Sequence, residues 1–409
     1  MAISIEKLKP GVSDSLFRYA VILFLVEFVR GAYLISYLPI YATEELGFSV
    51  SLVGLAVSIH YLADNLVKSI AGYLLDRFSW RLIVNSGLLL AFAGLGLLVA
   101  GQSEWMILTA AALLGIGGSP VWLVCLSRVD AAKRASQMGF LYTAWLGGLG
   151  LGPVLINLLM DQSYRLSFWL LMAMWGTAML LSTRLQPTNT QPYAQVSIRE
   201  QASMMAKRLR KLGPLVPGMI VQTMAAGMLV PILSSFAAKQ FGMSHSEYSL
   251  VLIVGGVSTA IFLIPMGRLW DRKGSKQLLA GGFAFFAAAL CGLTMVNTLG
   301  WALLLAVSLG IGYAAVLPAW NAMLGQFIPQ EQQGVNWGVF SSLEGLGVII
   351  GPILGGWLAG RYNESIAIWI SALLLAGLAL FYFRLPSSRL AEVETDASSR
   401  GQGTPLKSH

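Results

Sequence analysis

Charged residues are scarce in this sequence: they make up 11% of its 409 residues, while 56% are hydrophobic. Soluble domains carry about 25% charged residues, so the composition excludes an ordinary soluble globular protein. Cysteine is almost missing, and the two present, Cys125 and Cys291, lie far apart in apolar surroundings. A disulfide framework is therefore excluded, and there is no His/Cys metal spacing. Because phosphate loops and nucleophile–base pairs are missing as well, we expect neither an enzyme nor a cofactor or metal.

Long apolar runs are what the sequence does contain. A membrane-spanning helix needs about 20 apolar residues, and twelve runs reach this length. Their approximate limits are 18–41, 48–75, 81–101, 105–127, 136–159, 165–185, 214–238, 247–270, 277–298, 300–324, 336–360 and 363–384. The sequence therefore predicts an all-α polytopic membrane protein with twelve transmembrane helices.

The basic residues predict the orientation. Most of the 27 Lys and Arg residues precede the odd-numbered runs or follow the even-numbered ones. Basic loops stay on the cytoplasmic side, so we expect a multi-pass protein of the cell membrane with both termini in the cytoplasm. The net charge of +8 then reflects this topology and contact with anionic inner-leaflet lipids, and not nucleic-acid binding.

The sequence repeats itself in order. Gly72–Arg77 (GYLLDR) recurs as Gly267–Arg272 (GRLWDR), and Pro120-Val121-Trp122 recurs as Pro318-Ala319-Trp320. Matches in register predict two parallel six-helix repeats. The expected domains are a first bundle, a linker, a second bundle and a disordered cytoplasmic tail, over residues 1–185, 186–213, 214–385 and 386–409. The linker contains either a basic amphipathic helix on the membrane surface or a plain solvated helix.

Charges inside the first two runs are the leading candidates for a working site. A charge in hydrocarbon costs about 2.5–3.5 kcal/mol, so it usually faces a cavity or a partner. Glu27 and Arg30 share one helix face, and His60, Asp64 and Lys68 form a stripe on the next helix. We expect Arg30 between Glu27 and Asp64, with one of the two carboxylates carrying a coupled proton, Asp64 before Glu27. A structural ion pair is the alternative; His60 is either a relay or a packed neutral ring, and Lys68 is expected to extend toward the inner surface.

Three tryptophans lie inside runs and not at their ends, where Trp usually gathers. Trp122, Trp145 and Trp320 could stack on a sugar or simply pack in the core. Asn321 could bind substrate or join helices. Deep in the runs of the second half the only acidic residue is Glu344. A cavity that is polar on one side and apolar on the other suits an amphiphile.

The repeated loop resembles a known family. Gly-x-x-x-Asp-Arg between spans two and three, and again between spans eight and nine, is similar to the loop signature of the major facilitator superfamily. The resemblance implies that Asp76 and Arg77, together with Asp271 and Arg272, gate alternating access. Charges that only anchor the loop at the lipid headgroups are the alternative.

Further motifs resemble the lipoteichoic-acid glycolipid flippase (LtaA-like) branch. They are Leu25–Gly31, Ser58–Asp64, Ser119–Trp122, Gln137–Gly139, Leu317–Asn321 and Trp337–Phe340. The resemblance implies a bacterial, monomeric, proton-coupled secondary transporter that flips a diglucosyl-diacylglycerol-like glycolipid from the inner to the outer leaflet. It also implies a proton-linked pocket of Glu27, Arg30 and Asp64, with Trp122 and Trp145 on the sugar side; a basic residue at Lys68 departs from the pattern. The alternative is a proton-driven multidrug or small-amphiphile efflux antiporter, which usually carries an Arg in span four, where Ala110–Gly115 has none.

Overall fold

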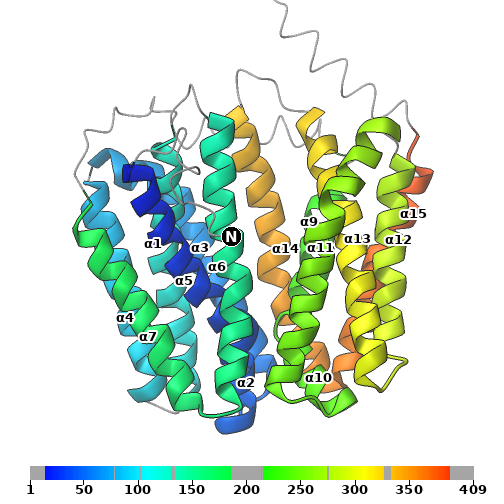
Figure 1. Cartoon of the computed structure of the whole chain (residues 1–409), viewed down its shortest axis with the longest axis horizontal. Helices are drawn as coiled ribbons and strands as arrows, with labels where there is room; N and C mark the ends of the chain where they lie inside the picture. The colour runs from blue at the N-terminus through cyan, green and yellow to red at the C-terminus, as the bar shows by residue number, and fades with distance from the viewer. Residues whose placement is uncertain are drawn as a thin grey trace, which may run out of the picture. The chain divides into compact units, whose positions relative to one another are not determined.

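The computed structural model describes residues 14–77, 79–100, 103–129, 134–185, 213, 215–273, 276–326 and 333–386. In these ranges the chain is helical and contains no β-strand (Figure 1). The linker helix and the disordered tail predicted from the sequence lie outside the described residues.

The first span combines four elements, which are α1 (Asp14–Gly31), the π-helix η2 (Ala32–Tyr37), α2 (Leu38–Ile40) and the π-helix η3 (Tyr41–Glu45). The following helices are α3 (Val50–Arg77), α4 (Trp80–Ala100), α5 (Glu104–Ser127), α6 (Arg134–Met160), α7 (Tyr164–Thr183), α9 (Val216–Leu229), α10 (Leu233–Phe241), α11 (His245–Lys273), α12 (Lys276–Leu293), α13 (Leu299–Gln326), α14 (Gln333–Arg361) and α15 (Glu364–Arg384). Eleven described spans are long and apolar enough to cross a membrane, and the number is twelve when α9 and α10 are counted together as one broken span. The predicted all-α fold with twelve spans is confirmed.

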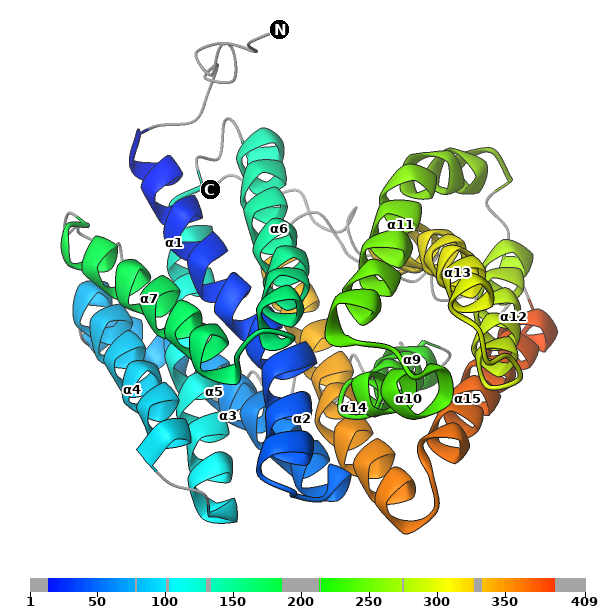
Figure 2. The same ribbon diagram turned by 60° about the horizontal axis from the view of Figure 1, so that its bottom comes forward.

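The same helix pairs pack in both halves of the chain. In the first half α1 packs on α6 and α7, and α4 packs on α5 and α7; in the second half α9 packs on α14 and α15, and α12 packs on α13 and α15 (Figure 2). Glycines sit at equivalent contacts. A Cβ on Gly152 of α6 would lie 2.1 Å from the Phe28 carbonyl oxygen, and one on Gly351 of α14 would lie 2.4 Å from that of Met224. Small residues therefore allow close helix packing in both repeats.

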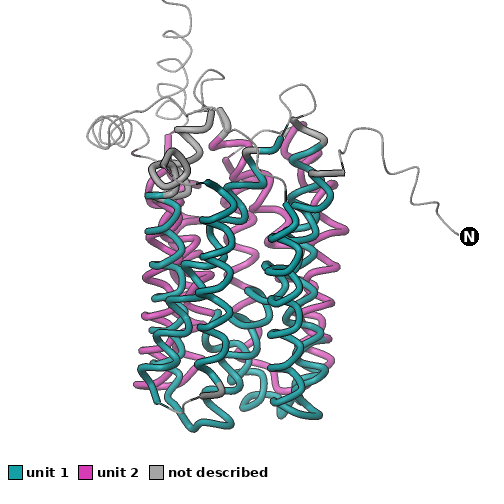
Figure 3. Tube along the Cα trace, turned by 90° about the vertical axis from the view of Figure 1, so that its left-hand side faces the viewer, with its two compact units in different colours: residues 1–194, 230–249 teal, residues 195–229, 250–409 magenta. Residues whose placement is uncertain are grey.

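Two compact units divide the chain (Figure 3): residues 1–194 with 230–249, and residues 195–229 with 250–409. The segment 230–249 belongs by sequence to the second repeat, yet it groups with the first. Within the first unit α10 packs on α2, and the Ser249 hydroxyl donates to the carbonyl oxygen of Val154 at 3.0 Å. The domain limits expected from the sequence are the limits of the two sequence repeats, whereas the two compact units are defined by contacts between residues.

A polar cluster holds the start of α11 in the first unit. Asp161, after the end of α6, accepts the backbone N–H groups of His245 at 3.0 Å and Ser246 at 2.8 Å, and also the Ser246 hydroxyl. Glu44 accepts from the Tyr164 hydroxyl at 3.0 Å and lies 3.5 Å from Nε2 of His245. Free N–H groups at a helix start favour a carboxylate there, so Asp161 caps α11.

This cap predicts a pH-dependent stability. Partial burial raises the pKa of Asp161, but the hydrogen bonds from Ser246 and His245 outweigh it and hold the pKa below its usual range. A lowered pKa in the folded state gives stability that is full above the unfolded value, near 4, and is lost as the pH falls through the folded value. Asp161→Ala should therefore lower the free energy of unfolding at pH 7 by about 0.5–1 kcal/mol, the low end for a cap because the side chain is exposed.

Thermal unfolding of the purified protein in detergent, at pH 7 and at pH 3, measures this effect. The difference between Asp161→Ala and the unaltered chain should shrink at pH 3. The neighbouring exposed Gln162→Ala is the control, and an equal loss in both variants would contradict the cap.

Candidate functional site

The first ion pair lies within α1. Glu27 is buried, and its Oε2 accepts from Nε of Arg30 at 2.8 Å and lies 2.6 Å from Nη2. The spacing of three residues places both side chains on one helix face. A glycine of α6 allows that helix to pack closely against Glu27, because an added Cβ on Gly148 would lie 3.1 Å from the Cβ of Glu27. Glu27 thus sits where α1 and α6 approach closely.

The second ion pair lies within α3 and involves α5. Oδ2 of Asp64 accepts from Nζ of Lys68 at 2.5 Å, and Oδ1 accepts from the Ser119 hydroxyl at 2.5 Å. Gly115 of α5 makes this possible, since a Cβ there would lie 2.3 Å from the carbonyl oxygen of His60. With Gly115 against His60, one turn further along both helices sets Ser119 against Asp64. Both carboxylate oxygens of Asp64 are therefore satisfied.

Two expectations need correction. Lys68 does not extend toward the membrane surface but binds Asp64, because the carboxylate one turn away offers a stronger partner than water at a distance. Among the described residues Arg30 forms its ion pair with Glu27 alone, although its charge still interacts with that of Asp64. The four charges therefore form two adjacent intrahelical pairs with a formal sum of zero.

His60 is fully buried beside these pairs. Its Nδ1 lies 3.2 Å from the carbonyl oxygen of Ala111 in α5, and its ring meets Tyr61 edge-on with centroids 5.5 Å apart. Because a carbonyl only accepts, Nδ1 carries the hydrogen. In the neutral ring Nε2 is then the basic nitrogen, and no hydrogen-bond partner for it is present in the described part of the chain. The contact of Nδ1 with the Ala111 carbonyl joins α3 to α5, and Nε2 is the nitrogen that remains available for the proton relay considered from the sequence.

An aromatic cluster joins α5 to α6 in the first unit. Trp122 lies 6.4 Å from Trp145 between ring centroids, and Tyr142 lies 5.3 Å from Trp122 and 6.4 Å from Trp145. Tyr142 is 46% exposed, so the cluster has an accessible edge. The sequence interpretation missed Tyr142, although its spacing of three residues from Trp145 places both on one helix face.

Trp320 has a different setting in the second unit. It is 2% exposed, its indole N–H donates to Oε1 of Glu344 at 3.2 Å, and its ring packs edge-on against Tyr382 at 6.0 Å. These contacts favour packing over sugar stacking for Trp320. The adjacent Asn321 is exposed.

The proposed gating residues are described only in part. The side chains of Asp76 and Arg77 lie outside the described residues. Asp271 and Arg272 are exposed near the end of α11, so their gating role stays a prediction.

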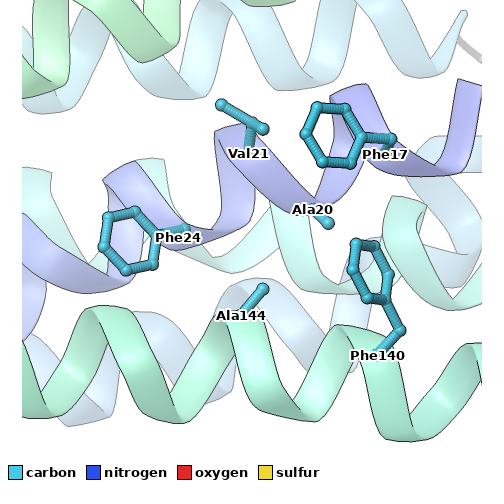
Figure 4. Close-up of a pocket in the computed structure, with 6 residues that line it drawn as sticks. All are labelled: Phe17, Ala20, Val21, Phe24, Phe140 and Ala144. Carbon is cyan, nitrogen blue, oxygen red and sulfur yellow. The ribbon is translucent and has the colours of Figure 1, made fainter. Parts of the chain in front are cut away.

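An apolar pocket of about 170 Å³ opens between α1 and α6 (Figure 4). Its walls contain carbon side chains, from Phe17, Ala20, Val21, Phe24, Phe140 and Ala144. Phe17 and Phe140 stack with centroids 6.3 Å apart. Such walls fit a hydrocarbon chain and offer nothing to a sugar hydroxyl.

Up to twelve membrane-length helices among the described residues, in two repeats with paired charges inside the first, define a membrane transporter with a polar site in its bundle. The chain belongs to the Major Facilitator Superfamily, whose family model matches residues 19–214 and 215–408.

Individual proteins of known name are also similar to this chain. The chain is 34% identical over 373 residues to the proton-coupled antiporter flippase LtaA of Staphylococcus saprophyticus and to that of Staphylococcus aureus strain N315. In both cases the match covers 88% of this chain and 92% of the relative. The solved structure of the nucleoside transporter NupG matches with a TM-score of 0.74 at 15% identity, over 91% of this chain and 100% of that chain. The last likeness concerns the fold alone.

Proposed function

We propose that this transporter is a proton-coupled antiporter flippase that moves a diglucosyl-diacylglycerol-like glycolipid from the inner to the outer leaflet by alternating access. The observation that carries the proposal is Asp64, a buried carboxylate whose two oxygens are held by Lys68 and Ser119 beside the Glu27–Arg30 pair. The names of the relatives support both the proton coupling and the flipping.

Asp64 is the better candidate for the proton site. Its partner Lys68 has a side chain that is 37% exposed and can turn away. Glu27 faces Arg30, which is only 15% exposed and presents two nitrogens to the same oxygen. A guanidinium cannot release its own proton and holds a carboxylate in fixed geometry. The Glu27–Arg30 pair is therefore a fixed ion pair without net charge, next to a carboxylate that exchanges its partner.

The lipid would be held by two surfaces of the first unit. The cluster of Trp122, Tyr142 and Trp145 offers aromatic faces for the apolar faces of sugar rings. The pocket between α1 and α6 offers carbon walls for part of an acyl chain. In the orientation predicted from the basic residues both termini are cytoplasmic, and the exposed Asp271 and Arg272 would gate the inner end together with Asp76 and Arg77. We expect the protein to act as a monomer.

Proteoliposomes with fluorescent lipids test the function. Labelled diglucosyl-diacylglycerol should flip faster under a proton gradient, and labelled phosphatidylcholine should not respond. Glycolipid flipping that ignores the gradient would exclude proton coupling. Equal flipping of both lipids would exclude headgroup recognition by the aromatic cluster.

A small-amphiphile efflux antiporter is the second candidate, because the carbon-walled pocket would accept any apolar chain or ring. Export of cationic dyes by vesicles that do not flip the glycolipid would favour it.

The aromatic cluster gives a separate prediction. Trp145→Ala removes a ring that touches both Trp122 and Tyr142, so glycolipid KM should rise about tenfold from lost stacking and apolar contact. Trp105→Ala is the matched control, because Trp105 is 78% exposed at the start of α5. Initial flipping rates at several glycolipid densities measure KM, and an unchanged KM in Trp145→Ala would remove the cluster from the lipid site.

A further inference from the structure

We propose that Lys68 is the tethered counter-charge of Asp64, so that proton binding by Asp64 and release of the Lys68 ammonium are one step. The inference rests on the proton coupling proposed above and names the residue that sets its pH range and its voltage dependence.

The geometry puts Lys68 in the position that a proton would take. Nζ lies 2.5 Å from Oδ2, while the Ser119 hydroxyl lies 2.5 Å from Oδ1, so a proton that binds at Oδ2 displaces the ammonium. The Asp64 side chain is 5% exposed and that of Lys68 is 37% exposed. Lys68 thus covers the buried carboxylate from its accessible side, and it is the only partner of Oδ2 among the described residues.

The other polar groups near Asp64 are neutral or bound elsewhere, so Lys68 is the cation that a proton on Asp64 displaces. On α3 itself, His60 is tied through Nδ1 to Ala111, and Tyr61 follows it. From α5, Ser119 is a neutral donor. From α1, Arg30 is bound to Glu27, and its charge acts on Asp64 without an ion pair to it. Lys68 is therefore the movable cation of the cluster.

The formal charges then fix which part of the transport cycle responds to voltage. With Asp64 ionised, Glu27, Arg30, Asp64 and Lys68 sum to zero. With Asp64 protonated and Lys68 released, the same four residues sum to one positive charge. The proton-loaded protein therefore carries one charge across the membrane, and an inside-negative potential drives it. The lipid-loaded, deprotonated protein moves a neutral site.

Lys68→Met keeps the aliphatic part of the side chain and removes its charge. The voltage-dependent step is then the one in which Asp64 is ionised. The site then carries one negative charge when Asp64 is ionised and none when it is protonated. The proton no longer competes with a tethered cation, so the pH at which flipping is half-maximal should rise by about one to three units, as expected for the loss of an opposite charge at this distance. Lys68→Arg keeps a cation and should retain the original behaviour.

Lipid exchange at equal pH on both sides isolates the lipid-loaded limb. Proteoliposomes contain glycolipid in both leaflets and the label in one, and a potassium gradient with valinomycin sets the potential. Exchange by the unaltered protein, by Lys68→Arg and by the exposed control Lys239→Met should change less than twofold with potential. Exchange by Lys68→Met should change severalfold, together with the shifted pH midpoint of gradient-driven flipping. Thermal unfolding of each variant checks that it is folded.

Three results would overturn the inference. The first is voltage-dependent exchange by the unaltered protein, and the second is Lys68→Met exchange as insensitive to potential as that of Lys68→Arg. The third is a pH midpoint that does not move in Lys68→Met. Each of these leaves the proposed function standing if glycolipid flipping by the unaltered chain follows the proton gradient. Failure of the unaltered chain to exchange glycolipid at all would overturn the proposed function and this inference with it.

Discussion

Asp64→Asn should flip lipid without any response to a proton gradient. The amide has nearly the shape of the carboxylate and still offers Oδ1 to the Ser119 hydroxyl. In the unaltered protein this hydroxyl lies 2.5 Å from Oδ1 of Asp64. It cannot take up a proton, and it cannot neutralise Lys68. We expect the flipping rate under a proton gradient to fall at least tenfold, to the rate measured without a gradient, which corresponds to about 1.4 kcal/mol or more in activation free energy.

The liposome flipping assay, with and without a pH gradient, measures this result. Ser119→Ala is the matched control, since it keeps the carboxylate and removes one hydrogen bond of about 0.5–1.5 kcal/mol. It should reduce the rate modestly and preserve the gradient dependence. Full gradient dependence in Asp64→Asn would move the proton site elsewhere, with Glu27 as the next residue to test.

Glu27→Gln should destabilise the fold itself. The change leaves Arg30, whose side chain is 15% exposed, without its carboxylate inside a membrane-spanning helix. Breaking a buried ion pair by removing one partner costs about 3–5 kcal/mol, because the remaining charge is uncompensated. Water reaching Arg30 and the nearby charge of Asp64 would reduce this cost, so we expect a loss of about 3 kcal/mol.

Removing both charges tests whether the loss of stability comes from the uncompensated charge of Arg30. The double variant Glu27→Gln with Arg30→Met leaves no orphaned charge and should regain most of the lost stability, although it should not regain transport. Thermal unfolding in detergent compares the two variants with the unaltered chain. A single variant as stable as the unaltered protein would mean that Arg30 is solvated and that the pair has no structural role.

Contacts within one helix could be predicted from the sequence, and contacts between helices could not. Glu27 and Arg30 pair as their spacing predicts. Asp64 and Lys68 are spaced for pairing as well, but the apolar stretch after Lys68 also allows a path to the membrane surface. Only the burial of Asp64 decides between these two outcomes, and burial depends on the neighbouring helices.

Ser119 and Tyr142 show the same limit. Ser119 becomes a partner of Asp64 because Gly115 allows α5 to approach α3 with His60 opposite it. Tyr142 becomes part of an aromatic cluster because α6 turns that face toward Trp122. Trp320 and Trp122 occupy matching places in the repeat, yet Trp320 is buried against Tyr382 and Glu344. A repeat in sequence preserves the helix and not the side-chain environment.

The sequence by itself determined the twelve membrane spans, the two repeats and the family, because hydropathy, charge distribution and the loop signature act over whole segments. It also determined which charges share a helix face. The tertiary structure alone decided that Lys68 and Ser119 hold Asp64, that Tyr142 joins two tryptophans, and that residues 230–249 group with the first repeat. These features depend on the rotation and register of helices that are far apart in sequence. Glycine contacts and hydrogen bonds between helices set that register, and neither has a periodic signal along the chain.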